Sequence, residues 1–293
     1  MPFTARFAPV PPRELPPART VVVPGRGEFF LRDTGAHLRG SDGRPVVLLL
    51  HGWLVNADLN WQVSYEPLRA AGYRVLAVDH RGHGRGLRPL VPFRLADCAD
   101  DAAAVVRALG LGPVTAVGYS MGGAIAQLLA RDHRDIVSGI VLSGTCQHWQ
   151  DPATRRAWRW MGAVGIGLGL APQWIFGHGL RRAGIPDDES GAWVLSELER
   201  NSAGDMAEAG RELGRFDSRP WLSSLRIPAA MVLTGRDGAV SPAKQRELAT
   251  AIRATVFEVG LDHLQLAYRP DLFNPALLSA VAAVALERAP APA

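Results

Sequence analysis

The hexapeptide GYSMGG at residues 118–123 is the segment whose residue types and spacing most directly indicate chemistry. Its serine, Ser120, stands between Gly118 and Gly122. Glycines in these positions let a strand turn sharply into a helix, because neither places a Cβ in the crowded contact between the two. A serine hydroxyl at such a turn can attack a carbonyl carbon when a base removes its proton. We therefore predict that Ser120 is a nucleophile.

The residues on either side of the hexapeptide predict the strand and the helix that this turn requires. Residues 113–117 form an apolar run, and residues 124–130 continue in a helical pattern. The first turn of a helix has main-chain N–H groups without partners and the positive end of the helix dipole. The N–H of Met121 is thus available to a developing negative charge.

Other short aliphatic runs alternate with helical patterns along the chain, and residues 95–109 carry the clearest apolar helical face. Two runs, at residues 21–23 and 29–32, are expected to pair as an antiparallel ribbon through a turn at 24–27. The remaining strand candidates are residues 45–50, 73–78, 136–142, 227–233 and 255–259. This alternation predicts an α/β fold with a mostly parallel central sheet flanked by helices.

The alternation stops over residues 146–225, which contain helical patterns separated by Gly and Pro and no strand run. Charges in this region nearly balance, so its apolar and aromatic content is its distinguishing feature. We predict a helical cap (lid) inserted over the sheet, with Trp158, Trp160 and Trp174 as substrate-binding candidates. The alternative is that the tryptophans only fill the cap's own core. The glycines of residues 160–176 either permit bending or allow close helix packing.

The chain resembles an α/β-hydrolase with a helical cap, over residues 21–286. The resemblance rests on the GYSMGG turn, on LLLHGW at residues 48–53, on DHRGHG at 79–84, on TGRD at 234–237 and on GLDH at 260–263. It implies a catalytic acid at Asp237 and a base at His263, in the order Ser120, Asp237, His263. Two departures, Gly86 where serine is frequent and Arg134 where proline is frequent, leave the substrate open.

The resemblance also assigns a role to each of these residues. His263 would take the Ser120 proton, because an imidazole changes protonation near neutral pH, and Asp237 would hold its tautomer. The backbone N–H groups of Trp53 and Met121 would form the oxyanion hole, where one donor is typically worth about 3 kcal/mol. No cofactor or metal is required by this chemistry.

The other titratable candidates have structural explanations. Asp262 and Asp151 are weaker choices than Asp237 for the acid, since the side chain of Asp262 should point away from its neighbour His263. The remaining histidines, the turn aspartate and the two cysteines are expected to brace loops or to fill the core, and these residues are His51, His80, His83, Asp79, Cys98 and Cys146.

Composition excludes several classes of protein. The net charge is +4 (32 basic against 28 acidic residues), and the basic residues are dispersed, which argues against nucleic-acid binding. Two cysteines without a CxxC motif exclude a disulfide framework and a structural zinc site. No secretory apolar region begins the chain and no run reaches the ~20 residues of a membrane span, so we expect a cytoplasmic protein.

These observations predict a domain plan and a function. The plan has a Pro-rich N-terminal extension (1–20), a hydrolase core (21–145 and 226–288), the helical cap (146–225) and a disordered tail (289–293). We expect a carboxylesterase or lipase-like serine hydrolase that acts on hydrophobic small-molecule esters. The alternatives of the same fold are a carbon–carbon bond hydrolase, a lactonase, a thioesterase or a cofactor-free haloperoxidase (perhydrolase). A small-molecule-binding protein on a hydrolase scaffold is the alternative outside enzymes.

Overall fold

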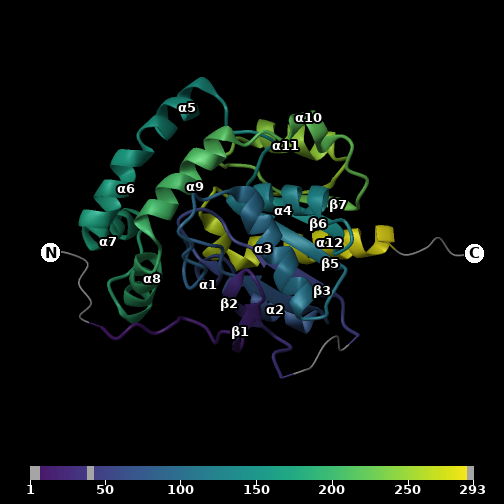
Figure 1. Cartoon of the computed structure of the whole chain (residues 1–293), viewed down its shortest axis with the longest axis horizontal. Helices are drawn as coiled ribbons and strands as arrows, with labels where there is room; N and C mark the ends of the chain where they lie inside the picture. The colour runs from purple at the N-terminus through teal and green to yellow at the C-terminus, as the bar shows by residue number, and fades with distance from the viewer. Residues whose placement is uncertain (1–6, 38–42, 289–293) are drawn as a thin grey trace, which may run out of the picture.

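A computed structural model of the chain describes residues 7–37 and 43–288. Eight strands form one sheet in the order β1-β2-β4-β3-β5-β6-β7-β8, antiparallel at β1/β2 and β2/β4 and parallel elsewhere (Figure 1). The strands are β1 (Ala18–Val23), β2 (Gly27–Asp33), β3 (Val46–Leu50), β4 (Arg74–Val78), β5 (Val114–Tyr119), β6 (Val137–Ser143), β7 (Ala229–Thr234) and β8 (Thr255–Val259). The predicted α/β architecture is confirmed.

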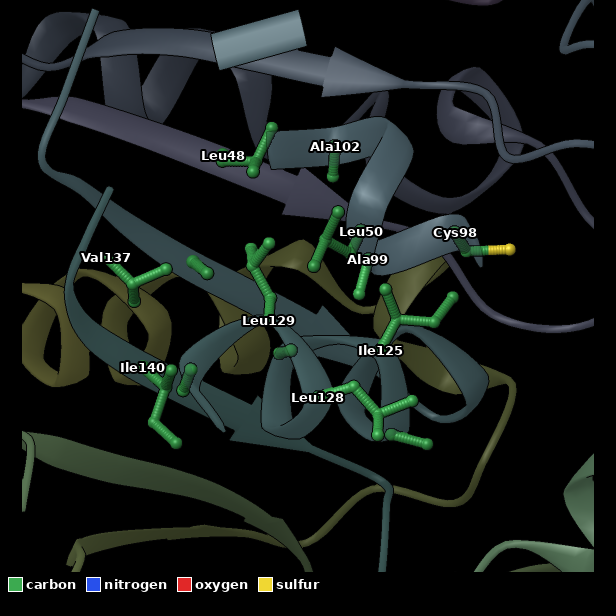
Figure 2. Packing of buried hydrophobic residues seen from close by; sticks show 14 of the residues in the cluster. Leu48, Leu50, Cys98, Ala99, Ala102, Ile125, Leu128, Leu129, Val137 and Ile140 are labelled. Carbon is green, nitrogen blue, oxygen red and sulfur yellow. The ribbon is translucent and has the colours of Figure 1, made fainter. Parts of the chain in front are cut away.

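Helices cover both faces of the sheet because its central strands are apolar on both sides. One face is covered by α3 (Leu95–Ala108), α4 (Met121–Asp132) and α11 (Pro242–Ala251), and the other by α1 (Ala57–Trp61), α2 (Tyr65–Ala70) and α12 (Pro270–Arg288), with the short helix η1 (Gln265–Ala267). Leu48 and Leu50 of β3 belong to the first core together with Ala102 and Ile125, as Figure 2 shows. Leu49 belongs to the second core, as strand alternation requires.

Between β6 and β7 the described structure contains helices and one isolated antiparallel bridge, between His148 and Asp217. The helices are α5 (Pro152–Arg159), α6 (Met161–Leu170), α7 (Pro172–Arg182), α8 (Glu189–Glu199), α9 (Ala203–Arg215) and α10 (Arg219–Leu222). We call α5 to α9 the cap helices. Figure 1 shows α5, α6 and α7 as an outer arc, with α9 between this arc and the sheet. Ala209 and Leu213 of α9 join the core of the sheet's first face.

The strand order determines where a site can form. β3 lies between β4 and β5, and Leu50 of β3 pairs with Gly118 of β5. The connections that leave these two strands diverge at their carboxyl ends, and this is the point where open α/β sheets bind ligands. The loop that contains Trp53 and the turn that contains Ser120 are therefore adjacent.

The N-terminal boundary differs from the prediction. β1 begins at Ala18, and Arg19 forms an ion pair with Asp33 of β2, so residues 18–20 belong to the sheet. Pairing with β2 decides this, and it could not be read from a Pro-rich segment. Residues 1–6 of the predicted extension and the predicted tail at 289–293 lie outside the described residues. In the described part of the chain, no helix is long and apolar enough to cross a membrane.

Candidate active site

Ser120 occupies a strained turn between β5 and α4. Its backbone has φ 53° and ψ −115°, a region that residues with side chains rarely adopt. Two hydrogen bonds hold it there, from the Ser120 N–H to the Ser143 carbonyl (3.0 Å) and from the Gly123 N–H to the Ser120 carbonyl (2.9 Å). Strain of this kind persists only where the surrounding structure over-determines it, and it concentrates at functional sites.

The two flanking glycines are required by close backbone contacts. A Cβ on Gly118 would lie 2.3 Å from the Gly122 carbonyl oxygen, and a Cβ on Gly122 would lie 2.0 Å from the Leu50 carbonyl oxygen. Neither contact can be relieved by rotating a side chain, because both involve backbone atoms. The Gly-x-Ser-x-Gly spacing is thus explained by how tightly α4 packs against β3 and β5.

Three side chains from distant parts of the sequence meet at this turn. The Ser120 Oγ lies 3.1 Å from His263 Nε2, and His263 Nδ1 lies 2.7 Å from Asp237 Oδ2. Ser120 follows β5, Asp237 follows β7 and His263 follows β8. The carboxyl ends of these parallel strands lie at one edge of the sheet, so the loops converge there. The arrangement can transfer a proton from the hydroxyl to the imidazole.

Asp237 is held by a dense set of donors. Its Oδ1 accepts the N–H groups of Ala239 and Val240, and its Oδ2 accepts the Thr234 hydroxyl. Burial by itself raises the pKa of Asp237, but the neighbouring His263 and these donors more than offset it and hold the pKa below its usual value. The carboxyl group therefore stays ionised, as an imidazolium partner requires.

The loop that carries His263 is fixed independently of Asp237. Asp262 accepts the N–H groups of Leu264 and Gln265, so its carboxylate closes the turn before η1 and does not contact the imidazole. The Tyr119 hydroxyl donates a hydrogen bond to the His263 carbonyl. Tyr119, the residue before the nucleophile, thus ties the histidine loop to the strand that carries Ser120.

The main-chain N–H groups of Trp53 and Met121 have no acceptor among residues 7–37 and 43–288. Leu54 has a φ of 67°, and its carbonyl accepts a hydrogen bond from the side chain of Asn201, which follows α8. The Gly52 N–H donates to Asn60 Oδ1 at 2.8 Å. The loop after β3 is therefore held on both sides of Trp53.

The three buried histidines brace this region. The Nε2 of His51 accepts a hydrogen bond from the His80 N–H at 2.9 Å. The Nδ1 of His51 lies 2.8 Å from the Gly52 carbonyl oxygen, and the His51 ring lies 5.4 Å from the His83 ring. Asp79 accepts the N–H groups of Ala57 and Arg85. These side chains join the loop after β3 to the turn after β4 and do not reach Ser120.

The predicted substrate-binding tryptophans have different environments. Trp158 is half-buried and lies edge-on to Trp53, whose Nε1–H donates to the Met206 carbonyl of α9. Trp160 and Trp174 are 71% and 64% exposed, and Trp174 stacks on His178 of its own helix. Of the three, Trp158 is the one that packs beside a proposed oxyanion-hole residue.

A cavity of about 200 Å³ opens beside the loop that holds Asp237. Its lining combines apolar and polar side chains, namely Cys146, Trp149, Asp151, Thr154, Gly238, Ala239, Val240, Ser241 and Lys244. Asp151 pairs with Lys244, and burial raises the pKa of the Cys146 thiol to about 12. Asp151 was a weak candidate for the catalytic acid in the sequence. Neither Asp151 nor Cys146 contacts His263. No group of His, Cys, Asp or Glu in the described ranges is arranged to hold a metal ion.

Sequence reasoning missed the residues that support the site from a distance. Asn60 orients the loop after β3, Tyr119 holds the histidine loop, and Asn201 reaches that first loop from the cap. Their contacts span 8, 144 and 147 positions in the sequence. Only the glycine-serine context of Tyr119 offered a local signal.

Comparisons with known proteins agree with this fold. Residues 45–163 match the family model described as the alpha/beta hydrolase fold. A non-heme haloperoxidase from Rhodococcus erythropolis is 40% identical over 118 residues, which is 40% of each chain. The match to 3-oxoadipate enol-lactonase 2 from Acinetobacter baylyi is 27% identical over 246 residues, 81% of this chain and 89% of that protein.

Solved structures extend the likeness to the whole fold. An esterase from Exiguobacterium antarcticum superposes with a TM-score of 0.74 at 19% identity, over 91% of this chain and all of that one (100%). The chain has the α/β-hydrolase fold, and the family model of that name matches residues 45–163.

Proposed function

We propose that the protein is a serine hydrolase that cleaves carboxylic esters of hydrophobic small molecules through an acyl-enzyme on Ser120. The chain of contacts from the Ser120 hydroxyl through His263 to Asp237 carries this proposal. A serine in the turn forms an acyl-ester with a carbonyl substrate, and the acyl group is then released by water.

Each step uses groups already described. The Ser120 Oγ attacks the ester carbonyl carbon while its proton passes to His263 Nε2, and Asp237 stabilises the resulting imidazolium. The carbonyl oxygen becomes an oxyanion that accepts the N–H groups of Trp53 and Met121. Collapse of this intermediate breaks the bond to the alcohol, which takes the proton from His263. Water then repeats the sequence and frees the acid.

The hydrophobic character of the substrate is proposed from the cap. Trp53 and Trp158 place two indole rings 5.5 Å apart between the loop after β3 and the cap. Trp149 and Val240 line the cavity beside the acid loop. Burying an apolar group against such surfaces is favourable by about 25 cal/mol per Å². The Trp158 indole N–H is buried without a partner and can donate to a polar atom of the substrate.

A lactone is a second candidate substrate, since it is an internal ester that the same steps would open. A sequence match over 81% of this chain is to an enol-lactonase. Lactone opening leaves alcohol and acyl group joined, so the product is a hydroxy acid. Thioesters are separated from esters by the same assay panel.

The experiment is labelling with a fluorophosphonate, followed by hydrolysis of p-nitrophenyl esters of increasing acyl length, of lactones and of thioesters. We expect covalent modification at Ser120, turnover of short and medium esters, and loss of nearly all activity in Ser120→Ala. Ser143→Ala is the matched control, because Ser143 is buried one strand away and its hydroxyl has no partner in the described structure. Labelling that persists in Ser120→Ala, or a native protein that binds apolar ligands but resists the reagent, would refute the proposal.

A further inference from the structure

The cap helix α6 is apolar throughout and yet lies on the surface. Its ten residues, MGAVGIGLGL, include no polar side chain, and only Met161 and Leu168 are buried. Ile166 and Leu170 are 66% and 82% exposed. Trp160 before the helix and Trp174 after it are exposed as well. A helix that is hydrophobic on all sides is ordinarily buried in a core or in a membrane.

The orientation of α6 explains which of its residues face outward. A Cβ on Gly165 would lie 2.9 Å from the Cβ of Ala207, and one on Gly169 would lie 3.9 Å from the Cβ of Ala203. Gly165 therefore packs closely against α9, and Ile166 and Leu170 are left on the outer side, whereas Met161 and Leu168 are buried. In Figure 1, α6 belongs to the arc that lies farthest from the sheet on that side. The fold thus presents an apolar ridge, which we define as Trp160, Ile166, Leu170 and Trp174.

The charged residues of the segment that carries this ridge have one sign. Residues 152–182 contain five arginines, Arg155, Arg156, Arg159, Arg181 and Arg182, and no aspartate or glutamate. The three on α5 are exposed, and none of them forms an ion pair within the described ranges. Burying an apolar ridge against a surface brings these guanidinium groups to the same surface. The partner surface that fits this ridge and its arginines has a negatively charged outer layer over an apolar interior.

We propose that the ridge and its arginines dock the protein on an anionic lipid bilayer. Indole rings and aliphatic side chains enter the boundary between headgroups and acyl chains, while arginines contact the lipid phosphates. Trp160 and Trp174 flank α6 as tryptophans flank apolar segments at membrane interfaces. Binding is peripheral, along the plane of the interface, and it places the cap against the membrane and the opposite edge of the sheet in water.

A second copy of the chain fits the ridge less well. A symmetric contact places the same patch on both partners. Each partner would then bring its arginines against those of the other, with no carboxylate in residues 152–182 to pair with them. Like charges facing each other at an interface oppose association. An anionic bilayer satisfies both the apolar and the charged parts of the patch.

Co-sedimentation with vesicles tests the proposal. The full-length protein is mixed with phosphatidylcholine vesicles with and without a one-third share of phosphatidylglycerol, at low and high salt. We expect binding to the anionic vesicles only, weakened by salt because the Debye length shortens from about 10 Å at 0.1 M. Each basic residue near an anionic surface strengthens binding roughly fivefold, so Arg155→Gln/Arg156→Gln/Arg159→Gln should bind about a hundredfold more weakly.

Two matched controls separate the ridge from general surface properties. Arg134→Gln/Arg226→Gln/Arg253→Gln removes the same charge from exposed residues that precede β6, β7 and β8, at the opposite edge of the sheet. Leu286→Glu places a carboxylate at a leucine of α12 that is 75% exposed, for comparison with Leu170→Glu. We expect the two control proteins to bind as the wild type does and Leu170→Glu to lose binding, while circular dichroism spectra stay unchanged.

Brominated lipids give a second readout. Bromine on the acyl chains should quench the fluorescence of Trp160 and Trp174 on binding. Trp160→Phe/Trp174→Phe should still sediment with the vesicles, since phenylalanine keeps an apolar ring, but should lose this quenching. Equal binding to neutral vesicles, no binding at all, or binding that the ridge and α5 variants leave unchanged would overturn the proposal. The proposal would also be overturned if the protein did not bind vesicles but formed a concentration-dependent dimer that Leu170→Glu abolished. Ser120→Ala should bind normally, so this test is independent of the proposed reaction.

Discussion

The carboxylate of Glu197 on α8 lies 2.6 Å from the Arg85 guanidinium, in the turn that follows β4. Its other oxygen accepts the Asn56 side chain at 2.6 Å, and the Glu197 side chain is only 2% exposed. This contact joins the cap to the core. Because Glu197→Ala leaves buried donors unpaired, we expect it to reduce the free energy of unfolding by about 3 kcal/mol. Urea denaturation followed by circular dichroism measures this.

Glu212→Ala is the control for Glu197→Ala. Glu212 on α9 pairs with Arg215 three residues along the same helix, and the Arg215 side chain is exposed. Exposed pairs contribute about 0.2–1 kcal/mol, so this variant should be close to the wild type. Similar losses in both variants would show that the buried contact is not special.

The packing of α4 against β3 predicts the effect of Gly122→Ala. The new Cβ would lie 2.0 Å from the Leu50 carbonyl oxygen, so the turn that carries Ser120 must move. Overpacking of this kind costs about 1–3 kcal/mol of stability. We also expect fluorophosphonate labelling to be lost, because the hydroxyl leaves the position set by His263. Stopped-flow labelling and thermal melts report the two effects.

Gly179→Ala provides the contrast. Gly179 lies inside α7 and a Cβ there meets no atom within 4 Å. Alanine is favoured over glycine in a helix by up to about 1 kcal/mol, so this variant should be as stable as the wild type or more so. It should label normally. A labelling defect in Gly179→Ala would show that the expected loss of labelling in Gly122→Ala is not specific to the packing at Gly122.

The buried histidines predict a loss of stability in acid. Burial lowers the pKa of His80 from 6.5 to about 3 and that of His83 from 6.5 to about 4. Between these values the unfolded chain binds more protons than the folded chain, so the free energy of unfolding falls as the pH falls. For His83 alone the loss is about 3 kcal/mol, at 1.36 kcal/mol per pKa unit. Urea midpoints measured from pH 7 down to pH 4 test this.

Asp79 acts in the opposite direction. Burial raises its pKa from 3.8 to about 6, so the folded chain binds the extra proton and acidification through this range adds stability. The two histidines outweigh the one carboxyl group. His83→Gln should therefore flatten the dependence of stability on pH, and Asp79→Asn should steepen it. A profile that neither substitution alters would contradict the assignment of the acid transition to these groups.

Asp237→Asn tests the proposed acid. Asparagine has nearly the same shape but no charge, and it can hold the imidazole in the wrong tautomer, for which a loss in kcat of about 10⁴-fold is typical. We expect the KM for a p-nitrophenyl ester to change little. Asp262→Asn, which removes the neighbouring carboxylate outside the relay, should retain most activity. A large loss in Asp262→Asn with little change in Asp237→Asn would reverse the assignment.

The elements that sequence predicted best are those with local causes. The Ser120 turn was visible because an apolar strand, two glycines and a helix are consecutive in the chain. The cap was visible as a gap in the alternation, but its internal arrangement was not. Its charges nearly balance over 146–225, which concealed the five arginines and absence of acids in residues 152–182. The glycines of α6 left bending and close packing open, and contact with α9 shows the latter for Gly165 and Gly169.

By itself the sequence determined the α/β alternation and the nucleophile turn, because both follow from the periodicity and backbone freedom of consecutive residues. Asp237 and His263 were assigned by resemblance, and Asp262 was set aside because adjacent side chains point apart. Tertiary structure alone decided that the Ser120 hydroxyl, the imidazole and the carboxylate touch, that Glu197 fastens the cap, and that Ile166 and Leu170 of α6 face outward. Those outcomes depend on contacts between residues far apart in the chain, which only the packed sheet and cap bring within reach.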